Sequence, residues 1–194
     1  VAFAIGIVAG VVGWFVQPKD APRQASTTPG ATMTLAPGER ALWTASAVMA
    51  KPAMILIGVA MLVILGSAVL VWFTGDATAG LVVGVVFVVV VAASVTSTAF
   101  HVRVDDNGLT GRSEFGLPKF NVPRADIASA EEIFVNPMGM FGGWGMRWAP
   151  GRFGVVLRSG PAIEVTRHSG KQFVVTVDDA ETGAALLTAL VARG

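Results

Sequence analysis

The strongest constraint on this chain is a pair of long apolar runs, residues 53–73 and 78–100, separated by a single Thr-Gly-Asp-Ala tetrapeptide. At about 1.5 Å per residue, a helix of either length spans the roughly 30 Å hydrocarbon core of a bilayer. The tetrapeptide is too short for a domain and suits a tight turn at one membrane face. We therefore expect a transmembrane helical hairpin over 53–100, with helices at 53–74 and 78–100.

The composition agrees with a membrane protein. The chain is 53% hydrophobic and 14% charged, whereas an average soluble domain is about 25% charged. The absence of cysteine excludes disulfides, thiolate metal sites and cysteine nucleophiles. A net charge of only +1 argues against a nucleic-acid-binding protein, which usually has a concentrated basic face.

The distribution of basic residues predicts the orientation of the hairpin. All 14 Lys and Arg residues lie within residues 17–52 or after Phe100, whereas the turn between the apolar runs contains only Asp76. The positive-inside rule then places both basic regions in the cytoplasm. The runs contain no ionisable residue that could relay protons or coordinate a coupling ion. We therefore expect a multi-pass protein of the cytoplasmic membrane with its soluble part in the cytoplasm.

The region before the hairpin divides into three segments. Residues 1–16 are apolar throughout and as a helix reach only about 24 Å, which predicts a truncated transmembrane helix. A signal peptide is the alternative, but a basic leading region and a small-x-small cleavage site are both missing. Residues 17–37, with four prolines, predict an extended cytoplasmic linker. Residues 38–52 alternate in polarity and fit a pre-membrane strand or an interfacial segment.

Two glycine pairs at a spacing of four mark possible helix-packing faces. Gly6 and Gly10 lie in the first apolar segment, and Gly80 and Gly84 lie in the second helix of the hairpin. Small residues at this spacing let two helix backbones approach closely, which predicts packing of the first apolar segment against the second helix of the hairpin. The alternative is coincidence, because Gly- and Ala-rich helices often contain this spacing.

After Phe100 the sequence changes to short alternating segments typical of a soluble β domain, residues 101–194. Asp106-Asn107-Gly108 supplies turn residues for a hairpin that begins where the second apolar run ends. Residues 123–127 fit a turn or a short helix. The predicted strands are 101–105, 109–113, 119–122, 128–135, 155–158, 162–167 and 172–177.

The end of the chain predicts an amphipathic helix. Asp178 can cap it, with Glu181 three positions later as in a capping box. The expected core-facing residues recur at helical spacing. They are Ala180, Leu186, Leu187, Leu190 and Val191.

About seven short strands followed by one C-terminal helix resemble a bacterial pleckstrin-homology-like (PH-like) domain over residues 101–194. The points of similarity are residues 104–109, 122–127 and 175–180. The whole chain is also similar to the C-terminal part of an uncharacterised family of multi-span bacterial membrane proteins. That similarity rests on residues 37–40, Trp43 and residues 141–147. The resemblance implies a membrane-tethered α+β domain, a β-barrel or sandwich closed by the C-terminal helix, that acts as an interaction module.

Residues 138–153 are the most unusual soluble stretch, because aromatic and arginine residues lie among glycines. Glycine lets the backbone bend sharply, and Trp together with Arg favours lipid headgroups or a partner surface. The alternative is that the rings pack onto the core of the domain. The candidate membrane-interface or partner-binding residues are Phe141, Trp144, Arg147, Trp148, Arg152 and Phe153.

No pattern predicts catalysis, a cofactor or a metal site. His101 and His168 lack a second histidine or a carboxylate pair at ligand spacing, and Glu131 and Glu132 would point to opposite faces of a strand. The glycines of residues 142–145 lack the Lys-Ser/Thr of a phosphate-binding loop.

We therefore expect a non-enzymatic membrane protein whose soluble domain binds protein partners, a second copy of itself or lipid headgroups. We expect no nucleic acid and no small-molecule substrate among its partners. The alternative is a component of a membrane transport or sensing system, with its polar membrane residues in upstream helices.

Overall fold

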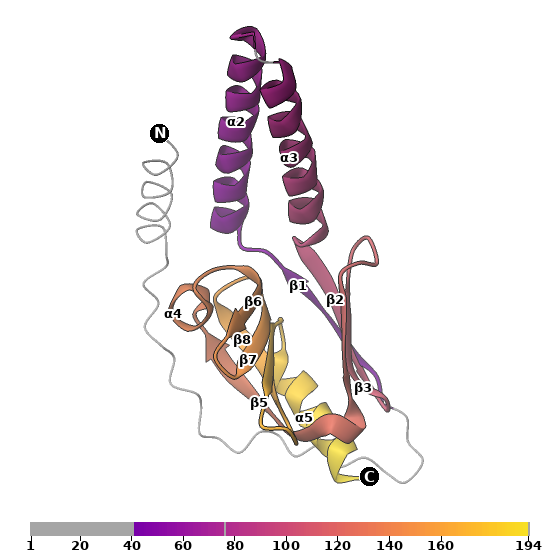
Figure 1. The fold of residues 1–194 in the computed structure, drawn as a ribbon. Helices are drawn as coiled ribbons and strands as arrows, with labels where there is room; N and C mark the ends of the chain where they lie inside the picture. Colours follow the sequence, from indigo (N-terminus) through magenta and orange to yellow (C-terminus); the bar gives the residue numbers. More distant parts are fainter. Residues whose placement is uncertain (1–40, 76, 194) are drawn as a thin grey trace. The chain divides into compact units, whose positions relative to one another are not determined.

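The computed structural model describes residues 41–75 and 77–193. Within them the chain forms two compact units, the helical residues 51–95 and an α+β unit of residues 41–50 and 96–193. Four helices and two β-sheets make up the described part (Figure 1). The predicted segments 1–16 and 17–37, with Gly6 and Gly10, lie outside the described residues.

The first unit is a hairpin of two apolar helices, α2 (Lys51–Phe73) and α3 (Ala77–Thr96). Both are long and apolar enough to cross a membrane, by length and composition. Their apolar side chains are largely exposed; Leu62 is 70% and Phe73 82% exposed. The prediction of two apolar helices is confirmed, but the end of the second at residue 100 is wrong. Phe100 is instead fully buried in a strand of the α+β unit.

Gly80 marks a close approach within the hairpin. A Cβ atom added to Gly80 of α3 would lie 3.1 Å from Cε3 of Trp72, so the Trp72 ring of α2 lies against α3 at this position. Among the described residues, a Cβ atom added to Gly84 would meet nothing within 4 Å. Gly80 is therefore in close contact with α2, whereas the predicted packing of Gly80 and Gly84 against the first apolar segment lies outside the described residues.

The α+β unit begins before the hairpin and resumes after it. Strand β1 (Trp43–Val48) precedes α2, and β2 (Ala99–Asp105) follows α3, yet the two strands pair antiparallel with Val48 opposite Ala99. The ladder continues to Met49, whose N–H donates to the carbonyl oxygen of Thr98 at 2.9 Å. The segment 38–52 therefore contributes a strand to the same unit as residues 101–194.

The four-strand sheet has the order β1-β2-β3-β4, with β3 at Gly108–Ser113 and β4 at Lys119–Pro123. The turn between β2 and β3 confirms the predicted hairpin. After β4 the chain turns through η1 (Arg124–Asp126) into the second sheet. Proline cannot donate to a strand ladder, which accounts for the end of the sheet strand at Pro123.

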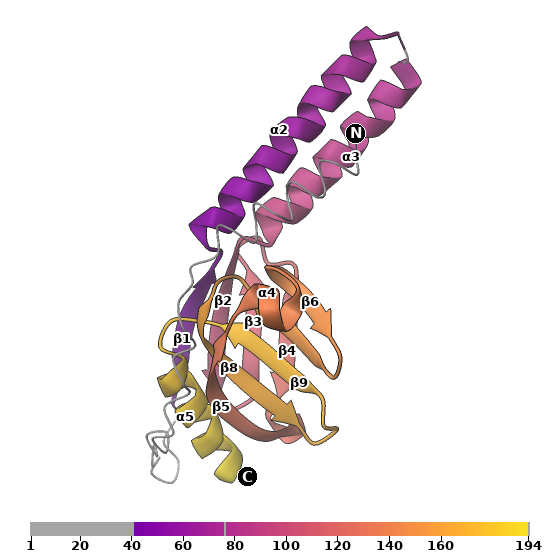
Figure 2. The ribbon, with the colours of Figure 1, turned by 90° about the vertical axis from the view of Figure 1, so that its left-hand side faces the viewer.

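The five-strand sheet has the order β5-β8-β9-β7-β6 (Figure 2). Its β7 and β9 are parallel and the other neighbours are antiparallel. The two sheets remain separate in the described residues, so the closed-barrel alternative is wrong. The elements are β5 (Ile127–Val135), α4 (Pro137–Phe141), β6 (Gly145–Ala149), β7 (Arg152–Val156), β8 (Gly160–Arg167) and β9 (Gln172–Thr176).

The C-terminal helix α5 (Ala180–Ala192) contacts strands of both sheets. Its predicted core stripe is confirmed, because Ala180, Leu186, Leu187 and Leu190 are buried and Val191 is half-buried. The predicted cap is wrong. The N-cap is Asp179, and its carboxylate makes no cap bond to a backbone N–H. It accepts instead from Nε1 of Trp43 at 3.2 Å and from Oγ1 of Thr182 at 2.6 Å.

Trp43 also packs its ring against Gly183 of α5. A Cβ atom added to Gly183 would lie 2.9 Å from Cη2 of Trp43 and 2.7 Å from Cδ1 of Ile163 in β8. The two sheets and the helix therefore converge on a glycine, and a larger residue would force them apart.

We expect Gly183→Ala to lower the thermal unfolding midpoint of the full chain in detergent micelles, measured by near-UV circular dichroism. Alanine in a helix ordinarily stabilises by about 0.5–1 kcal/mol relative to glycine, but overpacking here should cost about 1–3 kcal/mol. In an Ile163→Val background, which removes the nearest atom, the loss should be smaller. A higher midpoint for Gly183→Ala would contradict the packing described.

Candidate functional site

The outer face of the four-strand sheet is a polar groove. Because successive side chains of a strand point to opposite faces, residues such as Val102, Val104 and Leu109 are buried while their neighbours face outward. The outward residues line a groove of about 950 Å³. We use the name polar groove for its polar lining residues, which are Thr44, Ser46, His101, Arg103, Thr110, Arg112, Lys119 and Asn121.

The strand register arranges these side chains in two rows that cross all four strands. One row runs Ser46, His101, Arg112, Lys119, because each is the register partner of the next. The other row runs Thr44, Arg103, Thr110, Asn121 in the same way. Basic residues of three different strands are therefore neighbours in the first row.

Two basic residues of the polar groove lie next to a carboxylate and two do not. His101 Nε2 lies 3.0 Å from Oε2 of Glu114, and Arg103 Nε lies 2.9 Å from an oxygen of Asp105. Within residues 41–75 and 77–193, Arg112 and Lys119 have no ion-pair partner. The groove therefore has an excess of positive charge concentrated on β3 and β4.

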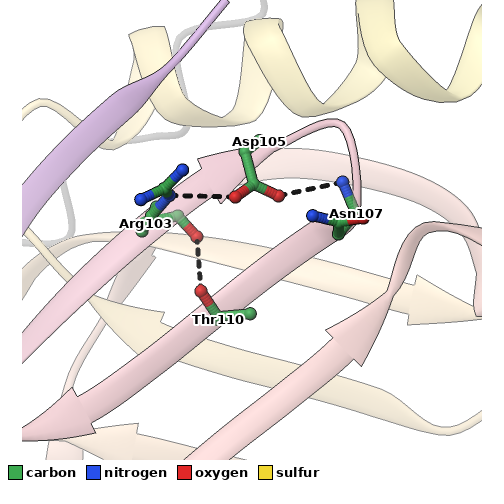
Figure 3. A network of polar contacts seen from close by, with 4 residues as sticks. All are labelled: Arg103, Asp105, Asn107 and Thr110. Carbon is green, nitrogen blue, oxygen red and sulfur yellow. Dashed lines mark hydrogen bonds and ion pairs between the residues drawn. The ribbon is translucent and has the colours of Figure 1, made fainter.

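Arg103 is held in place by the β2–β3 turn (Figure 3). Asp105 accepts from Nε of Arg103 and, through its other oxygen, from the backbone N–H of Asn107 at 2.9 Å. Thr110 donates its hydroxyl to the carbonyl oxygen of Arg103 at 3.5 Å. Because Asp105 balances the charge of Arg103, the cations best placed to meet an external anion are Arg112 and Lys119.

The polar groove is chemically suited to bind anions. Guanidinium and ammonium groups carry only hydrogen-bond donors, and together with nearby hydroxyls they suit phosphate or carboxylate groups. Among the described residues, no group of three or more His, Asp or Glu side chains is placed to hold a metal ion.

The structure does not gather the aromatic residues of the 138–153 stretch on one surface. Phe141 is buried in a cluster with Val135, Val156, Ala162 and Val174, so the core-packing alternative holds for this ring. Phe153 is half-buried, and its ring centroid lies 5.9 Å from that of Phe173. The ring centroid of Trp148 lies 4.7 Å from that of Phe153, with the rings tilted by 41°. Trp148 nevertheless remains 77% exposed, and Trp144 is half-buried.

The two arginines of this stretch make internal contacts. Arg147 is exposed, but its Nε donates to the carbonyl oxygen of Trp144 at 2.9 Å. Arg152 is half-buried, with Nη1 at 4.0 Å from Oε2 of Glu164. Of the six candidate residues, only Arg147 and Trp148 are exposed.

Sequence reasoning missed the polar groove because the rows exist only in the register of paired strands. The sequence does show a polar residue at every second position of four segments, including residues 44–46. It does not show that residues 44–46 pair with residues after the hairpin. Alternation predicts which face is outward, but it does not predict which strands are neighbours.

Glu164 is a buried acid next to the aromatic stretch. Its side chain accepts from Nε2 of Gln172 at 3.0 Å. Burial raises the pKa of Glu164, and the charge of Glu131 raises it further, while Arg152 opposes both by lowering it. Desolvation is the largest of these effects, so the charged form of Glu164 is disfavoured in the folded protein.

Comparisons of the chain with protein-family models, curated proteins and solved structures found no match. The resemblance to a PH-like domain therefore stays a prediction.

We expect Glu164→Gln to raise the thermal midpoint of the full chain at neutral pH. The folded pKa is raised above its ordinary value of 4.5, so the cost of the charge develops as the pH rises from that value through the folded pKa. The difference between the two proteins should vanish below about pH 4, where Glu164 is protonated in both states. Asp106→Asn, which removes an exposed carboxylate, is the control. A lower midpoint at neutral pH would show that the Arg152 contact outweighs desolvation.

Proposed function

We propose that the chain is an integral membrane protein whose α+β unit is a non-enzymatic, PH-like interaction module on the cytoplasmic side. The module binds anionic lipid headgroups through the polar groove. The observation that carries this proposal is the position of the α2–α3 hairpin, inserted between two strands that pair with each other.

The helices themselves support a membrane location. At about 1.5 Å per residue, helices of 23 and 20 residues reach roughly 30 Å or more. Of the residues in the most apolar stretch of each helix, 0% in α2 and 6% in α3 are buried, whereas the core helices of a soluble protein are mostly buried. Exposed apolar surface of this extent is unfavourable in water and favourable in lipid.

The connections between the module and the helices are short. The last ladder bond joins Met49 and Thr98, and the helices begin at Lys51 and end at Thr96. Only one or two residues separate the sheet from each helix, so this unit stays within a few residues' reach of the bilayer.

Charge favours lipid over a protein partner. The row with Arg112 and Lys119 lies two residues along the strands from the Val48–Ala99 end of the ladder, which is about 7 Å. The anionic surface of a cytoplasmic leaflet attracts such residues by about 1 kcal/mol each.

The proposed topology predicts the result of cysteine labelling in intact bacterial cells, because the natural chain contains no cysteine. We expect Thr74→Cys, at the hairpin turn, to react with a membrane-impermeant maleimide. Ser169→Cys, in the β8–β9 turn, should react only after the cells are permeabilised. The cysteine-free chain is the control, and the reverse labelling pattern would overturn the topology.

The lipid proposal predicts that Arg112→Gln reduces the enrichment of phosphatidylglycerol over phosphatidylcholine that co-purifies with the full chain. One basic residue contributes about 1 kcal/mol, so we expect a loss of roughly five-fold, measured by mass spectrometry of the bound lipids. Lys171→Gln removes the same charge from the β8–β9 turn, outside the polar groove, and should change the ratio little. Equal enrichment in both variants would contradict the proposal and favour a protein partner.

A further inference from the structure

The loop between β3 and β4, residues 114–118, exposes two large apolar side chains. Phe115 and Leu117 are each 65% exposed. Arg112 precedes the loop and Lys119 follows it, and these are the two cations of the polar groove that have no ion-pair partner among residues 41–75 and 77–193. The loop also contains the exposed Glu114, whose carboxylate lies next to His101 Nε2. Two apolar side chains with a cation on each side are suited to a lipid surface, where rings lie at headgroup depth and cations meet phosphates.

Hydrogen bonds place this loop at the end of the sheet from which the chain leaves toward the helices. The N–H of Glu114 donates to the carbonyl oxygen of Ala99 at 3.2 Å. Ala99 is the first residue of β2, three residues after the end of α3 at Thr96, and it pairs with Val48, three residues before α2. The loop is therefore fixed beside the two connections that tie the module to the hairpin.

The loop also has a defined shape. The N–H of Ser113 donates to the carbonyl oxygen of Pro118 at 3.0 Å, and the N–H of Gly116 donates to the carbonyl oxygen of Ser113 at 2.8 Å. The Ser113 hydroxyl donates to the carbonyl oxygen of Leu117. These contacts tie both ends of the loop to Ser113 and so fix the segment that carries the two apolar side chains.

We propose that this loop inserts Phe115 and Leu117 into the headgroup region of the bilayer that holds the hairpin, while Arg112 and Lys119 bind lipid phosphates. The inference rests on the proposed membrane location and names the segment that makes the contact. Interfacial amphipathic helices bury their apolar faces about 5–10 Å deep at the boundary between headgroups and acyl chains, and we expect a similar depth for these two side chains.

The exposed Trp148 is less well placed for the same role. It pairs with Phe153, three residues along β6 from the Gly145–Val156 pair, or about 10 Å. The Val156 end of that hairpin is the end near the connection to α2, because the N–H of Ala50 donates to the carbonyl oxygen of the adjacent Leu157 at 2.9 Å. Trp148 is thus displaced along β6 from the end near the connection to α2. The 114–118 loop, in contrast, lies directly at the end of the four-strand sheet where β1 and β2 connect to the helices.

The test uses the full chain in nanodiscs of phosphatidylcholine and phosphatidylglycerol. Phe115→Cys is labelled with the polarity-sensitive dye NBD, and Ser169→Cys, an exposed turn position, carries the same dye as the matched control. We expect a blue-shifted emission at position 115. We also expect the fluorescence intensity to fall roughly two-fold or more when brominated lipids are included, because the expected depth brings the dye into contact with the brominated chains. Position 169 should show a water-like emission without quenching.

A water-like, unquenched emission at position 115 would overturn the inference. A blue shift without quenching by brominated lipid would also overturn it, because the loop would then be covered by protein, such as a second copy. A label at Leu117→Cys separates insertion from local shielding, since its quenching should decrease in a Phe115→Ser background. Either failure leaves the cysteine-labelling topology and the lipid enrichment unchanged, whereas failure of those two experiments overturns the proposed function itself.

Discussion

The pairing of β1 with β2 is the interaction on which the rest of the structure depends. It joins residues that the apolar hairpin separates by about fifty positions, and it continues through Met49 and Thr98 to within two residues of the helices. Without this pairing the four-strand sheet would lose an edge strand and the polar groove would lose Thr44 and Ser46. The same strand carries Trp43, which bonds Asp179 and packs on Gly183, so β1 links the sheet to α5.

Most of the local structure could be predicted from the sequence. The two apolar helices, the turn before Gly108 and the buried stripe of α5 follow from hydrophobic period and turn chemistry, which are properties of neighbouring residues. The N-cap of α5 is Asp179 and not the predicted Asp178. The carboxylate of Asp179 bonds the indole of Trp43, a residue far away in the sequence that local patterns do not reveal. Strand β6 was missed because glycine and tryptophan in residues 145–149 gave no clear alternation.

The sites could be predicted less well, because they depend on contacts between distant segments. Composition singled out the 138–153 stretch, yet Phe141 turned inward and Arg152 turned toward Glu164. The polar groove, in contrast, uses ordinary polar residues that become neighbours only through the strand register. The exposure of Phe115 and Leu117 is likewise a property of the folded loop, since an apolar residue between two strands is as often buried.

Because the hairpin is inserted between two paired strands, the four-strand sheet can form only after both helices have been synthesised. β1 is synthesised before both helices and must wait for β2. In the proposed membrane topology, the two strands can meet only if the intervening chain returns to the compartment it left, which requires an even number of crossings. If the second helix failed to insert, the chain would cross only once, and β1 would lie on the opposite side of the membrane from β2. Correct insertion and completion of the sheet are therefore a single event, and a misinserted chain would expose an unpaired sheet edge that quality-control proteases can recognise.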